Sequence, residues 1–306
     1  MNLDKLSYKY LFFILISSLF LFYSGHNSLL APAQSNLKAF DNTTTLKFNP
    51  QPLPLLKYNL DPLQISSQSY LVMDLSSFTP IISYQPHKKM FPASTVKLAT
   101  ALVSFKQYNL DQKLIVNKTI DQELKMGLVK NEEITALNLL YGALVYSAND
   151  ASYTLAENYP GGVPAFVKQM NLLAKKLNMK KTHFTNPIGF DNNSQYTTAY
   201  DLALLSNEFI QKPLLLNIVS TKSITVSDTK FEHFHYLTSV NQLLGEIPHL
   251  GGLKTGTTDK AGENFISFYR FNNKPVLIVL LNSLDRFEDT RIILDYINQS
   301  LYYQSI

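Results

Sequence analysis

The chain has 306 residues, of which 45% are hydrophobic and 16% charged, so it has enough apolar material for a core and is not mainly disordered. Its 27 basic and 23 acidic residues give a net charge of +4. The basic residues are spread along the chain and only three are arginines, which argues against nucleic-acid binding. Cysteine is absent, and this excludes disulfides, thiolate metal sites and a cysteine nucleophile.

The N-terminus has the pattern of an export signal. Lys5 and Lys9 precede an apolar run from Tyr10 to Tyr23, which is shorter than the about 20 residues of a membrane-spanning helix and suits the apolar part of a signal peptide. Ala31-Pro32-Ala33 offers a small-x-small cleavage site, with a proline at its centre. We expect residues 1–33 to be a signal peptide or an N-terminal membrane anchor. The chain would then be exported, to the periplasm or the outer face of the cytoplasmic membrane.

The next segment, residues 34–68, is polar and interrupted by Pro50, Pro52, Pro54 and Pro62. Its hydrophobic pattern has neither a helical nor a strand period. We therefore predict a proline-containing linker here, followed by a folded domain over residues 69–306.

The folded part shows strand patterns at both ends and helical patterns between them. Strands are predicted at 70–74, 81–84, 251–257, 264–270 and 276–282, with a hairpin turn at Asn272-Asn273. A helix is predicted to begin near Ser94, and further helical stretches at 133–158, 163–177, 200–210 and 285–301. This order predicts an α+β fold in which the first and last segments share one antiparallel sheet.

The first candidate site is Ser94-Thr95-Val96-Lys97, at the start of a predicted helix. Residues three apart on a helix face the same way, so the Ser94 hydroxyl comes within reach of the Lys97 amine. A serine becomes a nucleophile when a base takes its proton, and a lysine whose pKa is lowered by burial and a neighbouring cation can be that base. Taken alone, the spacing is also typical of a solvated helix face.

The second candidate is the pair Ser147 and Asn149, which interrupts an apolar helical region. Burying such polar side chains is unfavourable unless they are hydrogen-bonded or line a cleft. Ser147 could relay a proton, and Asn149 could hold Lys97 and a substrate amide. The alternative interpretation is a helix end with capping residues.

The third candidate is Lys254-Thr255-Gly256, followed by Thr257, in a predicted strand. Lys254 and Gly256 would point to one face and Thr255 to the other. Gly256 would let a substrate backbone lie against the strand, and the Thr257 N–H could donate to a developing oxyanion. Lys254 would supply positive charge, which lowers the pKa of Lys97 and attracts a carboxylate. The alternative is an ordinary edge strand.

The three motifs together form a known set. Ser-x-x-Lys, Ser-x-Asn and Lys-Thr-Gly, in this order, occur in class A β-lactamases and penicillin-binding proteins. The chain resembles the D-alanyl-D-alanine carboxypeptidase family, which are low-molecular-mass, serine-type (S11-like) penicillin-binding proteins. The resemblance extends from about Ser69 to Tyr302. Its signature segments are Pro92–Leu98, Ser147–Ala151, Thr182–Asp191, Tyr196–Ala203 and Gly252–Asp259.

The resemblance implies a penicillin-binding/β-lactamase-like transpeptidase fold, with a D,D-peptidase catalytic domain at residues 69–306. It implies that Ser94 is the acylated nucleophile and Lys97 its base. Ser147 and Asn149 would assist proton transfer and substrate placement.

The resemblance also implies a substrate-binding strand formed by Lys254, Thr255, Gly256 and Thr257, with the backbone N–H groups of Thr257 and Ser94 as oxyanion hole. The expected enzyme is a serine-type D-Ala-D-Ala carboxypeptidase that removes the terminal D-alanine from peptidoglycan stem peptides and is acylated by penicillins and other β-lactams. Membrane attachment would come through the N-terminus. No metal, organic cofactor or nucleic acid is implied.

The sequence departs from the family pattern in several ways. Ile188 stands where the family often has histidine, and the chain ends just after the predicted terminal helix, so we expect no C-terminal β-rich domain. Arg286 is our choice for the arginine that helps to bind the substrate carboxylate.

Three alternative functions stay open. A D,D-endopeptidase of the same family shares the motifs, because cleft shape separates the two activities. A class A-like β-lactamase would need a glutamate on a loop between the second and third motifs. That loop would lie between Asn158 and Asn207, where no glutamate occurs. A non-enzymatic cell-wall-binding protein on the same fold is the third.

Two smaller patterns resemble cation sites. His233 and His235 would share one face of a strand, but a third ligand at suitable spacing is missing, so we predict an ordinary exposed strand. Asp191-Asn192-Asn193 is predicted to be a turn.

Overall fold

The computed structural model describes residues 52–57, 63–120 and 123–304. The described residues all belong to one compact unit, Pro50–Ile306. The predicted leader, 1–33, and residues 34–51 of the predicted linker lie outside the described residues. Within the described ranges, no helix is both long and apolar enough to cross a bilayer.

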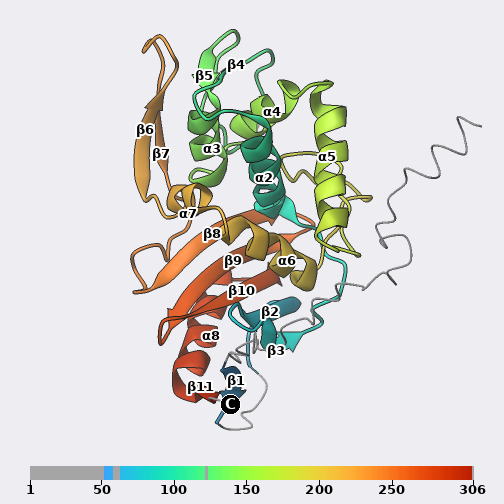
Figure 1. Ribbon diagram of the computed structural model, residues 1–306, viewed down its shortest axis with the longest axis vertical. Helices are drawn as coiled ribbons and strands as arrows, with labels where there is room; N and C mark the ends of the chain where they lie inside the picture. Colours follow the sequence, from blue (N-terminus) through green and yellow to red (C-terminus); the bar gives the residue numbers. More distant parts are fainter. Residues whose placement is uncertain (1–51, 58–62, 121–122, 305–306) are drawn as a thin grey trace, which may run out of the picture. The chain divides into compact units, whose positions relative to one another are not determined.

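A five-stranded antiparallel sheet forms the centre of the domain, with strand order β3-β2-β10-β9-β8 (Figure 1). The strands are β2 (Ser69–Asp74), β3 (Thr79–Tyr84), β8 (Leu250–Thr258), β9 (Gly262–Phe271) and β10 (Lys274–Ser283). Strands from both ends of the sequence therefore lie side by side, since β2 pairs with β10. The predicted α+β arrangement is confirmed.

The hairpin between β9 and β10 follows from its two turn residues. Asn272 and Asn273 have φ values of 48° and 63°, and asparagine is one of the few residues other than glycine that adopts this left-handed conformation readily. Such a two-residue turn matches the twist of the strands that it joins.

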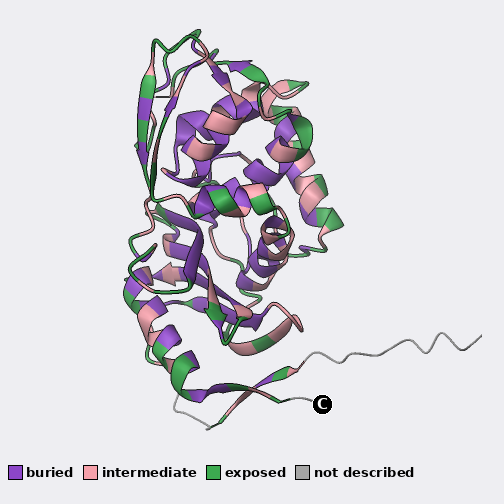
Figure 2. Cartoon of the chain, turned by 60° about the vertical axis from the view of Figure 1, so that its left-hand side comes forward, coloured by how far each residue is buried: buried purple, intermediate pink, exposed green. Residues whose placement is uncertain are grey.

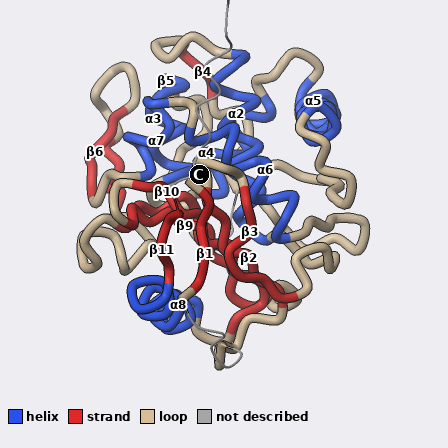
Figure 3. Tube along the Cα trace, turned by 60° about the horizontal axis from the view of Figure 1, so that its bottom comes forward, coloured by secondary structure: helices blue, strands red, loops and turns tan. Residues whose placement is uncertain are grey.

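The sheet is covered on both faces, and strand β10 shows this in its sequence. Leu277, Val279 and Leu281 belong to the core beneath the helices. Their neighbours Val276, Ile278 and Leu280 belong to a second core on the opposite face, under helix α8 (Arg286–Ser300). Continuous apolar runs of this kind are typical of a strand buried on both faces. Figure 3 shows α8 on one side of the strands and the other helices on the other side.

The helices of the domain bury their inner sides and expose their outer sides (Figure 2). A 3-10 helix, η1 (Ala93–Val96), leads into α2 (Lys97–Gln107), in agreement with the predicted helix start near Ser94. Around it are α3 (Ala136–Leu144), α4 (Asn149–Glu157), α5 (Gly162–Lys176), α6 (Ala199–Ile210) and α7 (Pro213–Val219).

The stretch 133–158, predicted as mostly helical, begins with a strand and is then divided into two helices. It opens with strand β5 (Glu133–Thr135), which pairs with β4 (Lys113–Ile115). Helix α3 then ends at Leu144, and α4 starts only at Asn149. Ser147 lies in the break with a φ of 66°, a left-handed conformation that a continuous helix cannot accommodate.

Two further strand pairs were not predicted as such. β6 (Ser223–Ser227) pairs with β7 (Phe234–Thr238) in a separate hairpin. β1 (Leu53–Leu56) pairs with β11 (Leu301–Gln304) at the far end of the chain. Strand β1 and residues 63–68 lie within the segment predicted to be a linker. Ser66 and Ser67 donate hydrogen bonds to Asp289 on α8, so this part of the segment is attached to the domain.

Candidate active site

Ser94 and Lys97 meet where η1 passes into α2. Lys97 is fully buried, and its Nζ lies 2.8 Å from Ser94 Oγ. The tight helical turn brings residues three apart onto one face, as the motif requires. Ala93 precedes them in a left-handed conformation, with a φ of 46°. Gly189 packs directly against its backbone, because a Cβ on Gly189 would lie 2.0 Å from the Ala93 carbonyl oxygen.

The hydrogen-bond partners of the Lys97 amine indicate where its hydrogens and its lone pair point. Nζ contacts the Ser147 carbonyl oxygen at 2.8 Å and Asn149 Oδ1 at 2.7 Å. Both oxygens can only accept, so they take two N–H groups. The remaining short contact is with Ser94 Oγ, which can donate its own proton. An unprotonated Lys97 held in this way directs its lone pair at the Ser94 hydroxyl.

Burial lowers the pKa of Lys97 to about 7, although the negative charge of Asp150 acts in the opposite direction. The cause is the loss of hydration that a buried ammonium suffers. At neutral pH a large fraction of the amine is therefore unprotonated, and the arrangement can transfer a proton from the serine hydroxyl to the lysine.

Ser147 and Asn149 come to Lys97 from the break between α3 and α4. Ser147 Oγ lies 3.3 Å from Lys97 Nζ, farther away than the carbonyl oxygen of the same residue. The side-chain amide of Asn149 is fixed at both ends, since its Nδ2 donates to the Glu123 carbonyl oxygen at 2.8 Å. Its backbone N–H donates to the Leu124 carbonyl oxygen at 2.7 Å.

Strand β8 forms the opposite side of the site. A bulge interrupts its pairing with β9 between Gly252 and Lys254. Gly256 packs directly on the start of the helix, because a Cβ there would lie 2.8 Å from the backbone nitrogen of Ser94. Thr255 is buried, whereas Thr257 is exposed beside the cleft.

Lys254 is buried two residues before Gly256, and its Nζ donates to the Thr255 carbonyl oxygen at 2.9 Å. Burial, together with the nearby charges of Lys97 and Arg286, holds the pKa of Lys254 well below its usual value. A negative charge brought close to Lys254 would counteract this lowering of its pKa.

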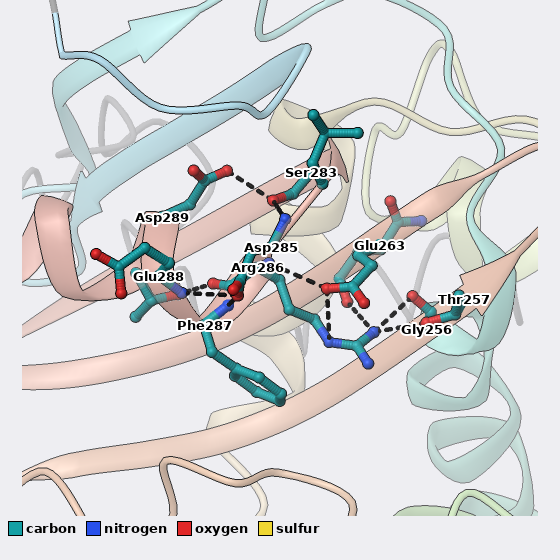
Figure 4. A network of polar contacts seen from close by, with 12 residues as sticks. Gly256, Thr257, Glu263, Ser283, Asp285, Arg286, Phe287, Glu288 and Asp289 are labelled. Atoms are coloured by element: carbon teal, nitrogen blue, oxygen red, sulfur yellow. Dashed lines mark hydrogen bonds and ion pairs between the residues drawn. The ribbon is translucent and has the colours of Figure 1, made fainter.

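Arg286 begins helix α8 and reaches the end of β8 (Figure 4). Its Nη1 donates to Thr257 Oγ1 at 2.7 Å and to the Gly256 carbonyl oxygen at 3.0 Å. Glu263 lies on its other side, with Oε2 3.7 Å from the Arg286 Nε. Asp285 caps the helix by accepting from the backbone N–H groups of Phe287 and Glu288.

A cleft of about 420 Å³ opens beside Ser94. Besides Ser94 and Asn149, it is lined by the segments 123–124, 188–191 and 257–259. Asn186 shapes the second segment, because its Oδ1 accepts from the backbone N–H groups of Gly189 and Phe190. Ile188 fills the position where the family often has histidine and is itself buried.

The residues singled out from the three motifs are thus brought to one place, and Arg286 joins them. Sequence reasoning did not single out Glu123, Leu124 and Glu263, because two of them act through backbone oxygens and the third only through Arg286. The prediction of an exposed strand was wrong for His235, which is buried and hydrogen-bonded to Glu132. In the predicted turn at 191–193, the Asp191 side chain accepts from Thr258 Oγ1.

Comparison with known proteins agrees with this geometry. The family model described as D-alanyl-D-alanine carboxypeptidase matches residues 57–284. The chain belongs to this family. Among its relatives, the carboxypeptidase DacA of Haemophilus influenzae is 29% identical over 248 residues, which cover 78% of this chain and 62% of the relative. A D-alanyl-D-alanine endopeptidase of Escherichia coli is 32% identical over 229 residues, 73% of this chain and 74% of the relative.

The chain thus spans less than two-thirds of the length of carboxypeptidase relatives such as DacA of Haemophilus influenzae.

Solved structures show the same fold. A penicillin-binding protein from Listeria monocytogenes in an ampicillin-bound form aligns with a TM-score of 0.69 and 30% identity, covering 77% of this chain and 99% of that one. A DD-transpeptidase from Streptomyces aligns with a TM-score of 0.71 and 25% identity, covering 78% and 98%. The predicted penicillin-binding fold is confirmed.

Proposed function

We propose that this protein is a serine-type D-Ala-D-Ala carboxypeptidase that removes the terminal D-alanine from peptidoglycan stem peptides. The observation that carries the proposal is the contact of 2.8 Å between Ser94 Oγ and a buried Lys97 whose pKa is lowered to about 7. Family membership and the carboxypeptidase names of several relatives support the choice of substrate.

In the proposed acylation, Lys97 takes the proton of Ser94 as Oγ attacks the carbonyl carbon of the penultimate D-alanine. The backbone N–H groups of Ser94 and Thr257 stabilise the negative oxygen of the tetrahedral intermediate. The proton then passes to the departing amine, with Ser147 assisting, and D-alanine leaves. Water later hydrolyses the ester and restores Ser94.

Strand β8 would hold the peptide during this step. The contact between Gly256 and Ser94 sets the strand at the distance where a peptide lying along it presents its carbonyl to Oγ. The terminal carboxylate would lie near Thr257, Arg286 and Lys254. Its negative charge would raise the pKa of Lys254 again and make the ammonium form a partner.

A penicillin would acylate Ser94 in the same way. The segment from Asn158 to Asn207 contains no glutamate to activate a deacylating water, so the penicilloyl ester should persist. This favours a penicillin target over a class A-like β-lactamase.

A D,D-endopeptidase is the second candidate. It is favoured by endopeptidase relatives of 32% and 33% identity, of which this chain covers 74% and 75%. The two activities are separated by the peptide that the cleft accepts: a free terminal D-alanine in one case, and a crosslinked neighbouring stem in the other.

The proposed substrate lies outside the cytoplasm. Lys5, Lys9 and the apolar run from Tyr10 to Tyr23 support export of the chain, with residues 1–33 acting as a cleaved signal or as an anchor. Residues 69–306 would form the catalytic domain.

Intact-mass spectrometry after treatment with benzylpenicillin tests the proposal, together with D-alanine release from a pentapeptide that ends in D-Ala-D-Ala. We expect one penicilloyl adduct on Ser94 and release of D-alanine, and neither in Ser94→Ala. An adduct that persists in Ser94→Ala would refute the assignment. Adduct formation without D-alanine release, but with cleavage of a crosslinked dimer, would favour the endopeptidase.

A further inference from the structure

A second buried polar cluster lies behind the cleft. His235 Nε2 on strand β7 is 2.7 Å from Glu132 Oε1, and the two side chains are 5% and 0% exposed. The other ring nitrogen, Nδ1, is 3.0 Å from the carbonyl oxygen of Met126. No part of the chemistry described above uses these groups.

The partners of the ring determine how many protons the cluster holds. The Met126 carbonyl oxygen can only accept, so Nδ1 carries a hydrogen. Glu132 Oε2 accepts from the backbone N–H of Val129 at 2.9 Å, which leaves Oε1 to face the ring. A hydrogen therefore lies between Nε2 and Oε1 at 2.7 Å, and because the pKa of His235 is raised, this contact favours the imidazolium–carboxylate form of the pair.

This pair holds a segment of chain in place. The Met126 peptide is bound from two sides, because its carbonyl contacts His235 and its N–H donates to Asp150 Oδ1 at 3.0 Å. Asp150 also accepts from the backbone N–H groups of Gly127 and Leu128. Residues 126–129 are therefore fixed by the buried side chains of His235, Asp150 and Glu132, of which the first two come from more distant parts of the chain.

The same segment leads directly into the cleft. Two residues before Met126, the Leu124 carbonyl oxygen accepts from the Asn149 backbone N–H, and the Glu123 carbonyl oxygen accepts from Asn149 Nδ2. These bonds decide which end of the Asn149 amide faces Lys97, since its Oδ1 is 2.7 Å from Nζ. Release of the segment would free this amide to turn.

We infer that His235 and Glu132 are positioning residues, whose buried pair holds residues 123–129 so that Asn149 keeps its oxygen on Lys97. The inference rests on the proposed function of Lys97 and Asn149. If the inference holds, the β6–β7 hairpin, which lies far from Ser94 in the sequence, helps to position the residues of the candidate site.

The charges around the ring give the pair a pH dependence. Burial by itself lowers the pKa of His235, but the hydrogen bond and charge of Glu132, the Met126 carbonyl and the charge of Asp150 raise it overall. On the same hairpin, Asp228 is engaged with the backbone N–H of His233, and Glu133 on β5 is engaged with Thr229 and Lys113. Because the folded pKa of His235 is raised, the stabilisation by the pair is present below the unfolded-state pKa of histidine and is lost as pH rises through the folded value.

The experiment compares wild type with His235→Gln, Glu132→Gln and the double variant. A single change leaves one buried charge without its partner, whereas two glutamines can hydrogen-bond without charge. We expect acylation by a fluorescent penicillin to fall about tenfold in each single variant and to recover to within about threefold in the double variant. We also expect the acylation rate of wild type, measured from about pH 6 to about pH 10, to fall again at alkaline pH as the pair loses its proton. This fall should be weaker in the double variant.

Hydrogen exchange gives a readout that does not need catalysis. The amides of residues 126–129 should exchange faster in the single variants, and the melting temperature of each variant reports whether it folds. His233→Gln is the matched control, since His233 lies on the same hairpin and bonds to Asp228 through its backbone atoms.

Unchanged acylation and exchange in His235→Gln, as in His233→Gln, would overturn the inference. So would a lower melting temperature with full acylation by the folded fraction. If His235→Gln does not fold, the double variant provides the test, because it keeps the shape of the pair without its charge. Acylation within about threefold of wild type would then support the inference, and a larger loss in a folded double variant would contradict it. Should wild type itself not label, the proposed function fails, and the exchange data still report on the pair.

Discussion

Arg286 Nη1 lies 2.7 Å from Thr257 Oγ1 and thereby joins the first turn of α8 to the last residues of β8 (Figure 4). A largely buried guanidinium on the C-terminal helix thus holds the end of the strand that lies beside Ser94. Glu263 on the neighbouring strand β9 lies 3.7 Å from the Arg286 Nε and accepts from the Arg286 backbone N–H. The C-terminal helix is thus part of the candidate site and not only a cover for the sheet.

We expect Arg286→Gln to lower kcat/KM for a D-Ala-D-Ala peptide by about tenfold to a hundredfold, because charge-assisted hydrogen bonds to the strand and to the substrate carboxylate are lost. Steady-state release of D-alanine measures the effect. Arg291→Gln is the matched control, since Arg291 lies on the same helix in a partly exposed ion pair with Glu246. Equal kcat/KM values for the two variants would show that Arg286 does not contribute to substrate binding or to the position of β8.

The acylation rate should increase as pH rises through about 7. Only the unprotonated Lys97 can accept the Ser94 proton, and the pKa of Lys97 is lowered to about 7. Stopped-flow acylation by a chromogenic cephalosporin measures the profile. Lys97→Arg, whose side chain stays protonated, should be inactive at every pH. A rate that does not change from acid to neutral pH would contradict the role of Lys97.

Gly256→Ala should lower acylation by about a hundredfold while the protein stays folded. The new Cβ would lie 2.8 Å from the Ser94 backbone nitrogen and 3.2 Å from that of Thr95, so the strand and the helix start must move apart. In Gly252→Ala, the control on the same strand, the nearest atoms belong to the Asn241 side chain, which can turn away. Normal acylation by Gly256→Ala would mean that the close contact is not needed.

Asp289→Ala should destabilise the fold by about 2–4 kcal/mol, because this carboxylate accepts hydrogen bonds from Ser66, Ser67 and Ser283. Burial acts to raise the pKa of Asp289, but these hydrogen bonds outweigh it and lower the pKa. The stabilisation is therefore present above the unfolded-state pKa and is lost as pH falls through the folded value. Urea unfolding near neutral pH and at acid pH measures both effects. Asp295→Ala, an exposed change on the same helix, should leave stability within about 0.5 kcal/mol of wild type.

Local features of the fold were predictable because their causes are local. The Asn272-Asn273 turn, the continuous apolar run of β10 and the start of α2 at the Ser94 motif all depend on neighbouring residues. The short strands β4 and β5 have too few residues to show a period. β1 is defined only by its partner β11, at the other end of the chain.

Strand β7 shows why burial was harder to predict than secondary structure. Its aromatic residues Phe234 and Tyr236 are exposed, whereas His235 between them is buried. Hydrophobicity alone predicts the reverse. The outcome is decided by Glu132, which lies 103 positions away in the sequence and provides the opposite charge.

The order and spacing of Ser94, Lys97, Ser147, Asn149 and Lys254 by themselves determined the family and the chemistry to be expected, because a reaction needs particular functional groups and sequence lists them. Only the tertiary structure decided which atoms those groups touch. It showed that Ser147 contacts Lys97 most closely through its carbonyl oxygen, and that Arg286 anchors the end of β8. The physical reason is that hydrogen bonds and desolvation act over a few ångströms in space, while the residues that share them are separated by long stretches of chain.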